Sequence, residues 1–130
     1  MDTLFVILII LAVIILFAVI RNTRRSKYLK TLTEDQFVEG YRKAQLIDVR
    51  EPQEFDNGHI LGARNIPVTQ MKQRLNEIRK DKPVYLYCQR SSRSTRAADL
   101  LHKRGYQDLS QLKGGFSRWT GKVKVKKKAY

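Results

Sequence analysis

The only cysteine of the chain, Cys88, begins a segment whose residue types could do nucleophilic chemistry. In and directly after the segment YLYCQRSSRST, three arginines lie close behind the cysteine: Arg90, Arg93 and Arg96. A thiolate is the nucleophilic form of cysteine, and its pKa falls when cations and helix N-terminal amides surround it. Because residues 88–93 lead from a predicted strand directly into a predicted helix, free backbone N–H groups are expected to form an anion-binding cradle. The pattern therefore predicts an ionised Cys88 beside a negatively charged substrate group.

A structural interpretation of Cys88 stands beside this one, because a lone cysteine commonly packs as a small apolar residue. Its position favours the reactive interpretation, since a core cysteine gains nothing from lying at a strand end ahead of Arg-Ser-Ser-Arg-Ser. A single cysteine cannot form an internal disulfide, so a reducing cytosolic setting is the simpler expectation.

Short apolar runs that alternate with helical patterns predict the elements that position this loop. Strands are predicted at 44–49, 63–67, 83–88 and 108–112. Helices are predicted within 31–41, after Pro52, at 71–80, within 91–106 and after the Gly114-Gly115 turn. Strands and helices in alternation predict an α/β fold with a parallel sheet covered on both faces.

Polar residues stand at the ends of two predicted strands. Asp48, Arg50 and Glu51 follow one strand, and Cys88 to Arg93 follow another. In a parallel sheet both sets emerge at the same edge, where ligand chemistry collects.

An unbroken apolar run, Leu4–Ile20, fills the N-terminal part of the chain. Its 17 residues would form a helix roughly 25 Å long, close to the roughly 30 Å hydrocarbon core of a bilayer. A buried core helix is a poor alternative, because the run has no polar face. The run therefore predicts a single membrane span.

The charges around this run predict its orientation. Asp2 precedes it, whereas a cleaved signal peptide would carry positive charge there. Five cations follow it closely: Arg21, Arg24, Arg25, Lys27 and Lys30. By the positive-inside rule, we expect a single-pass protein of the cell membrane with its N-terminus outside and its folded domain in the cytoplasm.

The formal net charge of +14 could indicate nucleic-acid binding, but its distribution argues against it. The cations beside the apolar run and those in the tail KVKVKKK are not interleaved with aromatic residues. Attraction of both stretches to anionic lipid headgroups is expected, with simple solvation of the tail as the alternative. The expected divisions are a span at 1–20, a basic linker at 21–32, a folded domain at 33–121 and a disordered basic tail at 122–130.

Two longer motifs carry a resemblance to a known family. LIDVREPQEFDNGHILGARNIP resembles the first signature of the rhodanese domain, and LKGGFSRW is similar to its closing signature. The resemblance covers roughly Thr33 to Thr120. It implies the rhodanese-like fold, a five-stranded parallel sheet flanked by helices, and transfer of sulfur from thiosulfate or a persulfide through a cysteine persulfide.

The resemblance also implies roles for individual residues. Cys88 matches the persulfide-forming residue, and the rest of the six-residue catalytic loop is Gln89, Arg90, Ser91, Ser92 and Arg93. Asp48 and Arg50 match charged residues that lie beside the loop and help to fix it. The same comparison gives capping and packing roles to Glu51 and Glu54 and a structural role to His59, while Trp119 is expected in the core and His102 in solvent.

Ser91 departs from the family, in which many active members carry glycine in the middle of the loop. Glycine permits backbone angles that a side chain resists. Serine could tolerate these angles, or it could tilt the cradle and weaken turnover.

The predicted function is that of a membrane-anchored sulfurtransferase, which takes sulfur from thiosulfate or a persulfide and passes it to a thiol or cyanide, with a partner protein as a possible source or acceptor. No metal or organic cofactor is expected, and no nucleic acid. A membrane-tethered binding module without catalysis is one alternative, supported by Ser91. A cysteine phosphatase or arsenate reductase is another, but phosphatases place arginine where this chain has Ser94.

Overall fold

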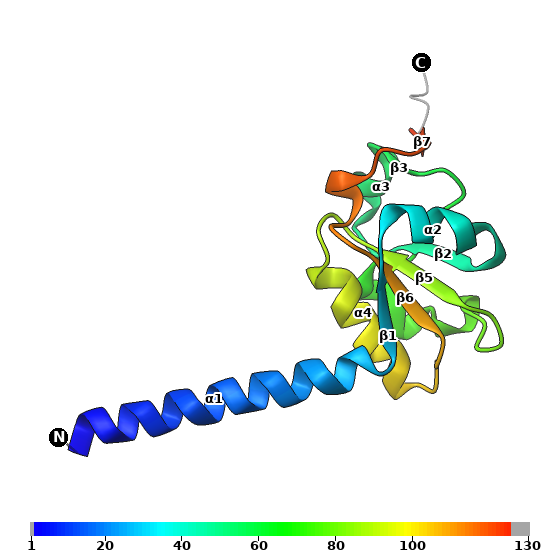
Figure 1. Ribbon diagram of the computed structural model, residues 1–130. Helices are drawn as coiled ribbons and strands as arrows, with labels where there is room; N and C mark the ends of the chain where they lie inside the picture. Colours follow the sequence, from blue (N-terminus) through cyan, green and yellow to red (C-terminus); the bar gives the residue numbers. More distant parts are fainter. Residues whose placement is uncertain (1, 126–130) are drawn as a thin grey trace.

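The chain begins with helix α1 (Asp2–Ser26), which projects from the rest of the molecule and ends far from it at the N-terminus (Figure 1). The computed structural model describes residues 2–125 of the chain. None of the residues of α1 is buried, and the helix is long and apolar enough to cross a membrane. A signal sequence passes the same test of length and composition, so the membrane span stays a prediction.

Five parallel strands form the central sheet, in the order β1-β6-β5-β2-β4. Their bounds are β1 Leu29–Leu32, β2 Gln45–Asp48, β4 Arg64–Asn65, β5 Val84–Tyr87 and β6 Leu109–Leu112. A separate two-stranded antiparallel sheet joins β3 (His59–Ile60) to β7 (Val123–Lys124). The predicted α/β class and the predicted five-stranded parallel sheet are both confirmed.

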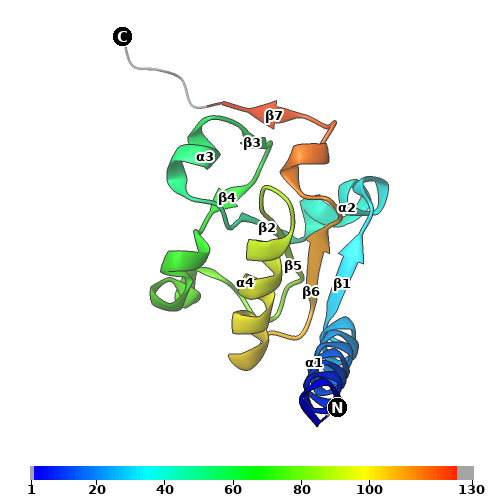
Figure 2. The same ribbon diagram turned by 90° about the vertical axis from the view of Figure 1, so that its left-hand side faces the viewer.

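Helices cover both faces of the large sheet, with α4 on one face and α2 on the other (Figure 2). The α-helices of the domain are α2 Glu34–Gly40, α3 Pro52–Asp56 and α4 Ser92–Lys103. Short 3-10 helices are η1 Tyr41–Lys43, η2 Val68–Gln73, η3 Leu75–Glu77 and η4 Phe116–Arg118. As predicted, α2 is capped by Thr33, whose side chain accepts from Gln36 N while the Gln36 side chain accepts from Thr33 N.

The alternation of side chains along β5 divides the core into two clusters. Val84 and Leu86, together with Cys88 directly after the strand, pack in the cluster beneath α4. Tyr85 and Tyr87 pack in the cluster on the opposite face, beneath α2. Successive side chains of a strand point to opposite faces, so the thiol must lie on the same face as the helix that follows it.

The fifth strand of the sheet, β1, lies where the sequence predicted a linker at 21–32. Helix α1 continues through the basic residues to Ser26, and β1 then pairs with β6 along four residues, Leu29–Leu32. The strand was missed because it is an edge strand in which only Leu29 is buried, so LKTL shows no strong apolar pattern. The folded domain therefore begins before residue 33.

The predicted helix at 71–80 is wrong. The segment instead contains the end of η2 and all of η3, and Ile78 has an extended backbone. Met71, Leu75 and Ile78 still reach the cluster beneath α4. Consecutive 3-10 turns also bring residues three or four apart to one side, so the periodicity predicted burial correctly and the helix type incorrectly.

The tail also differs from its prediction. Strand β7 pairs with β3 through His59 and Lys124 and through Ile60 and Val123, so the chain keeps a regular conformation past Gly121. The remaining residues of the predicted tail, 126–130, lie outside the described part of the chain.

Candidate active site

Cys88 lies at the carboxyl edge of the sheet, directly after β5. Asp48 and Tyr87, the last residues of β2 and β5, are partners in the parallel register. Because α4 begins at Ser92, the chain turns from strand to helix within residues 88–91. The Cys88 side chain is 1% exposed, so its sulfur lies at the bottom of this turn rather than on its surface.

The sulfur atom of Cys88 contacts one residue of the first turn of α4. Ser94 N donates to Sγ at 3.3 Å, and the Ser94 hydroxyl lies 3.6 Å from Sγ. Within residues 2–125, this is the one backbone amide that donates to the sulfur. Of the predicted cradle of backbone amides, the one that contacts Sγ is that of Ser94, which lies one residue beyond the predicted loop.

The Ser94 hydroxyl belongs to a buried network that reaches across to β6. Its oxygen lies 2.9 Å from Ser91 O and 2.8 Å from Gln111 Oε1, and the Thr95 hydroxyl contacts the same two acceptors. Gln111 Nε2 in turn donates to Thr31 Oγ1 at 3.1 Å. The hydroxyl of Ser94 has a single proton, so it donates to one acceptor at a time and accepts from the Cys88 thiol through a lone pair. Gln111 was not recognised from the sequence.

Ser91 occupies its place in the loop without left-handed backbone angles. Its φ is −173°, and no residue other than glycine has a positive φ within residues 2–125. Its carbonyl accepts from Thr95 N at 3.0 Å as well as from the Ser94 and Thr95 hydroxyls. The φ of Ser91 therefore does not require glycine, and the effect of the serine on turnover stays a prediction.

Asp48 and Arg50 lie beside the loop, as expected from the sheet topology, and they form a buried ion pair. Arg50 Nη2 lies 2.8 Å from Asp48 Oδ2, with the side chains 3% and 0% exposed. The guanidinium also donates to Gln89 Oε1 at 3.0 Å and to Gly58 O at 2.6 Å, and it lies over the Phe116 ring at 4.4 Å. Burial acts to lower the pKa of Arg50, but the bonds to Asp48 outweigh it and raise the pKa overall. The pair therefore connects β2, the Cys88 loop and α3's C-terminal turn.

A second ion pair joins the loop to α3. Arg93 Nη1 and Nη2 lie 2.5 Å and 2.9 Å from the two carboxylate oxygens of Glu54. Glu54 also accepts from Glu51 N at 3.2 Å, which completes the predicted capping of α3. The hydrogen bond from Arg93 holds the pKa of Glu54 below its usual value. Arg93 was predicted as a fixed positive charge for Cys88, but its charge is compensated by Glu54 in this conformation.

The segment that follows the Gly114-Gly115 turn holds the loop backbone through two hydrogen bonds. Phe116 N donates to Cys88 O at 2.8 Å, and Ser117 N donates to Gln89 O at 2.9 Å. Gly115 has φ 67° and ψ −164°, a conformation open essentially to glycine alone. A Cβ there would lie 2.4 to 2.7 Å from backbone carbonyls of the loop. The closing signature therefore has a physical role that the sequence did not show: it fixes the loop backbone.

The other predicted residues fall into two groups. Arg90 and Ser92 are exposed at the rim of the loop. His59 is buried, with Nδ1 2.8 Å from Phe55 O and its ring stacked on Phe55, in agreement with a structural role. Trp119 is partly buried against the cluster beneath α2, close to its expected place in the core.

The geometry therefore offers a buried sulfur atom, an amide that donates to it, and a loop fixed from three sides. Such a site can stabilise negative charge on sulfur, which suits attack on an electrophilic sulfur atom. Within residues 2–125, no three His, Cys, Asp or Glu side chains are grouped so as to hold a metal ion.

Comparisons with known proteins agree with this geometry. A family model described as Rhodanese-like domain matches residues 27–122, which includes β1. The uncharacterized protein YqhL of Bacillus subtilis is 60% identical over 94% of this chain and 97% of its own length. Thiosulfate sulfurtransferase GlpE of Shewanella oneidensis is 33% identical over 60% of this chain and 77% of its own length. A solved rhodanese-like domain protein from Staphylococcus aureus has a TM-score of 0.68 and 26% identity over 75% of this chain and 99% of its own.

Proposed function

This chain belongs to the rhodanese-like domain family, and we propose that it is a membrane-anchored sulfurtransferase whose Cys88 carries sulfane sulfur as a persulfide. The observation that carries this proposal is the placement of Cys88 Sγ under the first turn of α4, 3.3 Å from Ser94 N. Relatives whose names give a thiosulfate sulfurtransferase activity support the proposal.

The reaction proceeds in two displacements at sulfur. The Cys88 thiolate attacks the sulfane sulfur of thiosulfate, a new S–S bond forms, and sulfite leaves with the electron pair of the broken S–S bond. A thiolate or cyanide acceptor then attacks the outer sulfur of the persulfide. The bond between Cys88 Sγ and the outer sulfur breaks, and its electron pair stays on Cys88, which is again a thiolate. Ser94 N–H stabilises negative charge on the Cys88 sulfur before and after transfer, while Arg50 and Gly115 keep the loop in place.

Thiocyanate release by the full chain in detergent tests this proposal. The protein is incubated with thiosulfate and cyanide, and intact mass is measured after thiosulfate alone. We expect thiocyanate formation and an added mass of one sulfur atom, both abolished in Cys88→Ala. If wild type and Cys88→Ala give the same thiocyanate rate and the same mass, the sulfurtransferase proposal is wrong.

A binding module without catalysis is a second candidate, favoured by the burial of Cys88 and by the pairing of Arg93 with Glu54. The mass measurement separates the two, because a module would not gain sulfur. A phosphatase receives less support: Ser94, at the position where phosphatases carry arginine, is fully buried against the thiol.

The anchoring part of the proposal rests on the length and composition of α1 and on the cations that follow Leu4–Ile20. We propose that the domain lies in the cytoplasm. Added protease should leave the domain uncut in intact cells and cleave it in inverted vesicles. Cleavage in intact cells would reverse the proposed orientation.

A further inference from the structure

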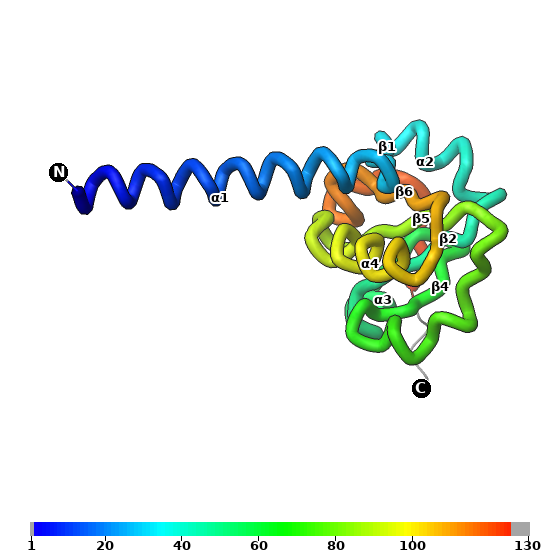
Figure 3. The backbone as a smooth tube through the Cα atoms, turned by 90° about the horizontal axis from the view of Figure 1, so that it is seen from below, coloured from blue at the N-terminus to red at the C-terminus, as the bar shows by residue number. Residues whose placement is uncertain are grey.

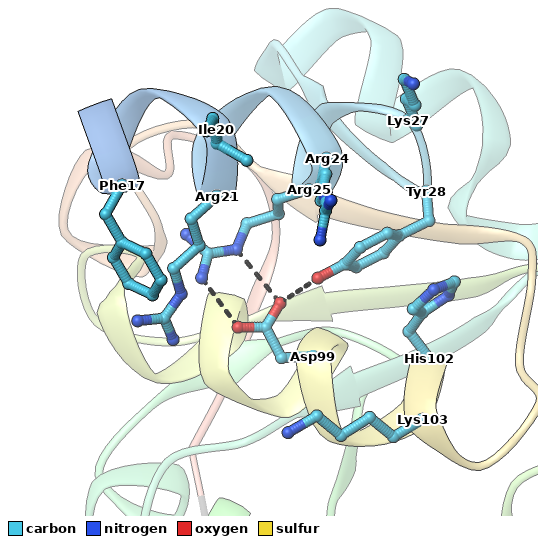
Figure 4. A pocket seen from close by; sticks show the side chains of 10 residues that line it. All are labelled: Phe17, Ile20, Arg21, Arg24, Arg25, Lys27, Tyr28, Asp99, His102 and Lys103. Atoms are coloured by element: carbon cyan, nitrogen blue, oxygen red, sulfur yellow. Dashed lines mark hydrogen bonds and ion pairs between the residues drawn. The ribbon is translucent and has the colours of Figure 1, made fainter. Parts of the chain in front are cut away.

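A groove of about 890 Å³ lies where α1 meets α4 (Figure 4), and its lining includes none of the residues of the Cys88 loop. Its size falls within the roughly 300–1,000 Å³ common for small-molecule sites. The lining residues come from both helices and from the turn between α1 and β1: Phe17, Ile20, Arg21, Arg24, Arg25, Lys27, Tyr28, Asp99, His102 and Lys103. Part of the predicted linker therefore contributes to a defined surface.

Asp99 of α4 holds the two walls of this groove together. Its carboxylate oxygens lie 3.1 Å and 2.8 Å from Arg25 Nε and Nη2, and it also accepts from the Tyr28 hydroxyl. The Tyr28 ring stacks on His102 with the ring centroids 3.8 Å apart. Burial acts to raise the pKa of Asp99, but the bonds from Arg25 and Tyr28 outweigh it and lower the pKa. Specific contacts therefore join the C-terminal end of α1 and the turn after it to α4, and from there α1 runs away from the domain (Figure 3).

The cations of the groove exceed its carboxylates. Asp99 is the one carboxylate that lines it, and its charge is used by Arg25. The side chains of Arg21, Arg24, Lys27 and Lys103 form no ion pair or hydrogen bond within residues 2–125. The groove is therefore lined by more positive charge than Asp99, which is paired with Arg25, can compensate. The excess near α4 comes from Arg21, Arg24 and Lys103 (Figure 4).

The groove changes from apolar to cationic along α1. Phe17 is 66% exposed and Ile20 is 43% exposed, and both belong to the apolar run. Arg21 and Arg24 follow Phe17 and Ile20 by four residues each, so each cation lies one turn beyond an apolar side chain on the same side of the helix. An anionic phospholipid matches this order, because its charged headgroup is joined to an apolar hydrocarbon chain.

We propose that the groove between α1 and α4 binds an anionic phospholipid, with its phosphate among Arg21, Arg24 and Lys103 and its acyl chain along Phe17. This inference rests on the proposed membrane anchoring. The bound lipid brings α4 to the membrane surface beside α1. The orientation of the domain therefore depends on the charge of the lipid as well as on α1.

Lipid retention by the full chain in detergent micelles tests this site. Native mass spectrometry is carried out with added phosphatidylglycerol or phosphatidylcholine. We expect one phosphatidylglycerol per chain, held at least tenfold more tightly than phosphatidylcholine. The double variant Arg24→Gln/Lys103→Gln should weaken phosphatidylglycerol binding by roughly tenfold or more, since each cation near an anionic lipid contributes measurably.

The matched control is Arg42→Gln/Lys43→Gln, which removes the same charges from η1 and should retain the lipid. Equal binding of the two lipids, or equal loss in the control, would overturn the proposal in favour of diffuse attraction. Displacement of the lipid by inorganic phosphate would show a soluble phosphate site instead. Alkaline carbonate extraction of membranes tests anchoring separately, because release of the protein contradicts the anchor whereas the micelle result concerns only the groove.

Discussion

Two arginine–carboxylate pairs flank the Cys88 loop, and they differ chiefly in burial. The side chains of Arg50 and Asp48 are 3% and 0% exposed, whereas those of Arg93 and Glu54 are 30% and 35% exposed. Removing one partner of a buried pair leaves an uncompensated charge and costs about 3–5 kcal/mol, but a surface pair contributes about 0–1 kcal/mol.

This difference in burial suggests that the Asp48–Arg50 side of the site is fixed, whereas the Glu54–Arg93 side can rearrange. Arg50 is also bonded to Gln89 and Gly58, so its position cannot change without disturbing the loop and β2 together. The pair of Arg93 with Glu54 is part-exposed, so we expect that Arg93 could exchange Glu54 for an anionic substrate at small cost in folding free energy. We therefore expect the buried contacts to control stability and the exposed pair to control turnover.

The largest effect is expected for Arg50→Ala, which leaves Asp48 buried without its guanidinium partner. The free energy of unfolding should fall by about 3–5 kcal/mol. Urea denaturation followed by circular dichroism measures this loss. The matched variant Arg93→Ala should cost about 1 kcal/mol or less. Similar losses in the two variants would show that burial does not distinguish the pairs.

Gly115→Ala tests the turn that holds the loop. Strain at the left-handed backbone and overlap with the loop carbonyls should lower the free energy of unfolding by about 2–4 kcal/mol and reduce thiocyanate formation. Gly62→Ala is the control, because its φ of 94° gives strain while no atom lies within 4 Å of the added Cβ. A fully active Gly115→Ala variant would argue against the turn as a support of the site.

Gln111→Ala tests the buried hydroxyl network. Loss of the acceptor for Ser94 and Thr95 should cost about 1–2 kcal/mol, because buried polar groups would lose a partner. The control Gln45→Ala removes comparable bonds to Arg79 at the exposed end of the sheet and should cost less. The measurement is the shift of the denaturation midpoint from wild type in each variant. Equal shifts would mean that the buried network stabilises the fold no more than the exposed bonds of Gln45 do.

The smallest effect on stability is expected for Glu54→Gln. The folded-state pKa of Glu54 is lowered, so the pair with Arg93 stabilises the fold above the unfolded-state pKa of about 4.3, and this stability is lost as pH falls through the folded-state value. Wild type should exceed Glu54→Gln by at most about 1 kcal/mol at pH 7, and the difference should vanish at low pH. A difference that grows on acidification would contradict this assignment.

The sequence predicted the site residues that follow from simple topology. Asp48, Arg50 and Cys88 stand at strand ends, and the rule that such ends meet at one edge of a parallel sheet was sufficient to group them. Ser94 and Gln111 could not be found in this way. Their contact depends on the register that places Leu86 opposite Gln111 and on the turn that brings α4 over the thiol.

The same limit explains the errors in the fold. LKTL was assigned to a linker because an edge strand with one buried residue resembles a polar connection. The partner of the tail residues Val123 and Lys124 is β3, more than half the domain away in sequence, and local composition gives no signal for such pairing.

Strand β1 determines where the domain can be separated from its helix. A fragment that starts at Thr33 would lack the edge strand and expose the hydrogen-bonding groups of β6, together with its apolar residues Leu109 and Leu112. An open edge of this kind pairs readily with other chains and leads to aggregation. A soluble fragment should therefore begin near Lys27, so that the sheet retains its natural border.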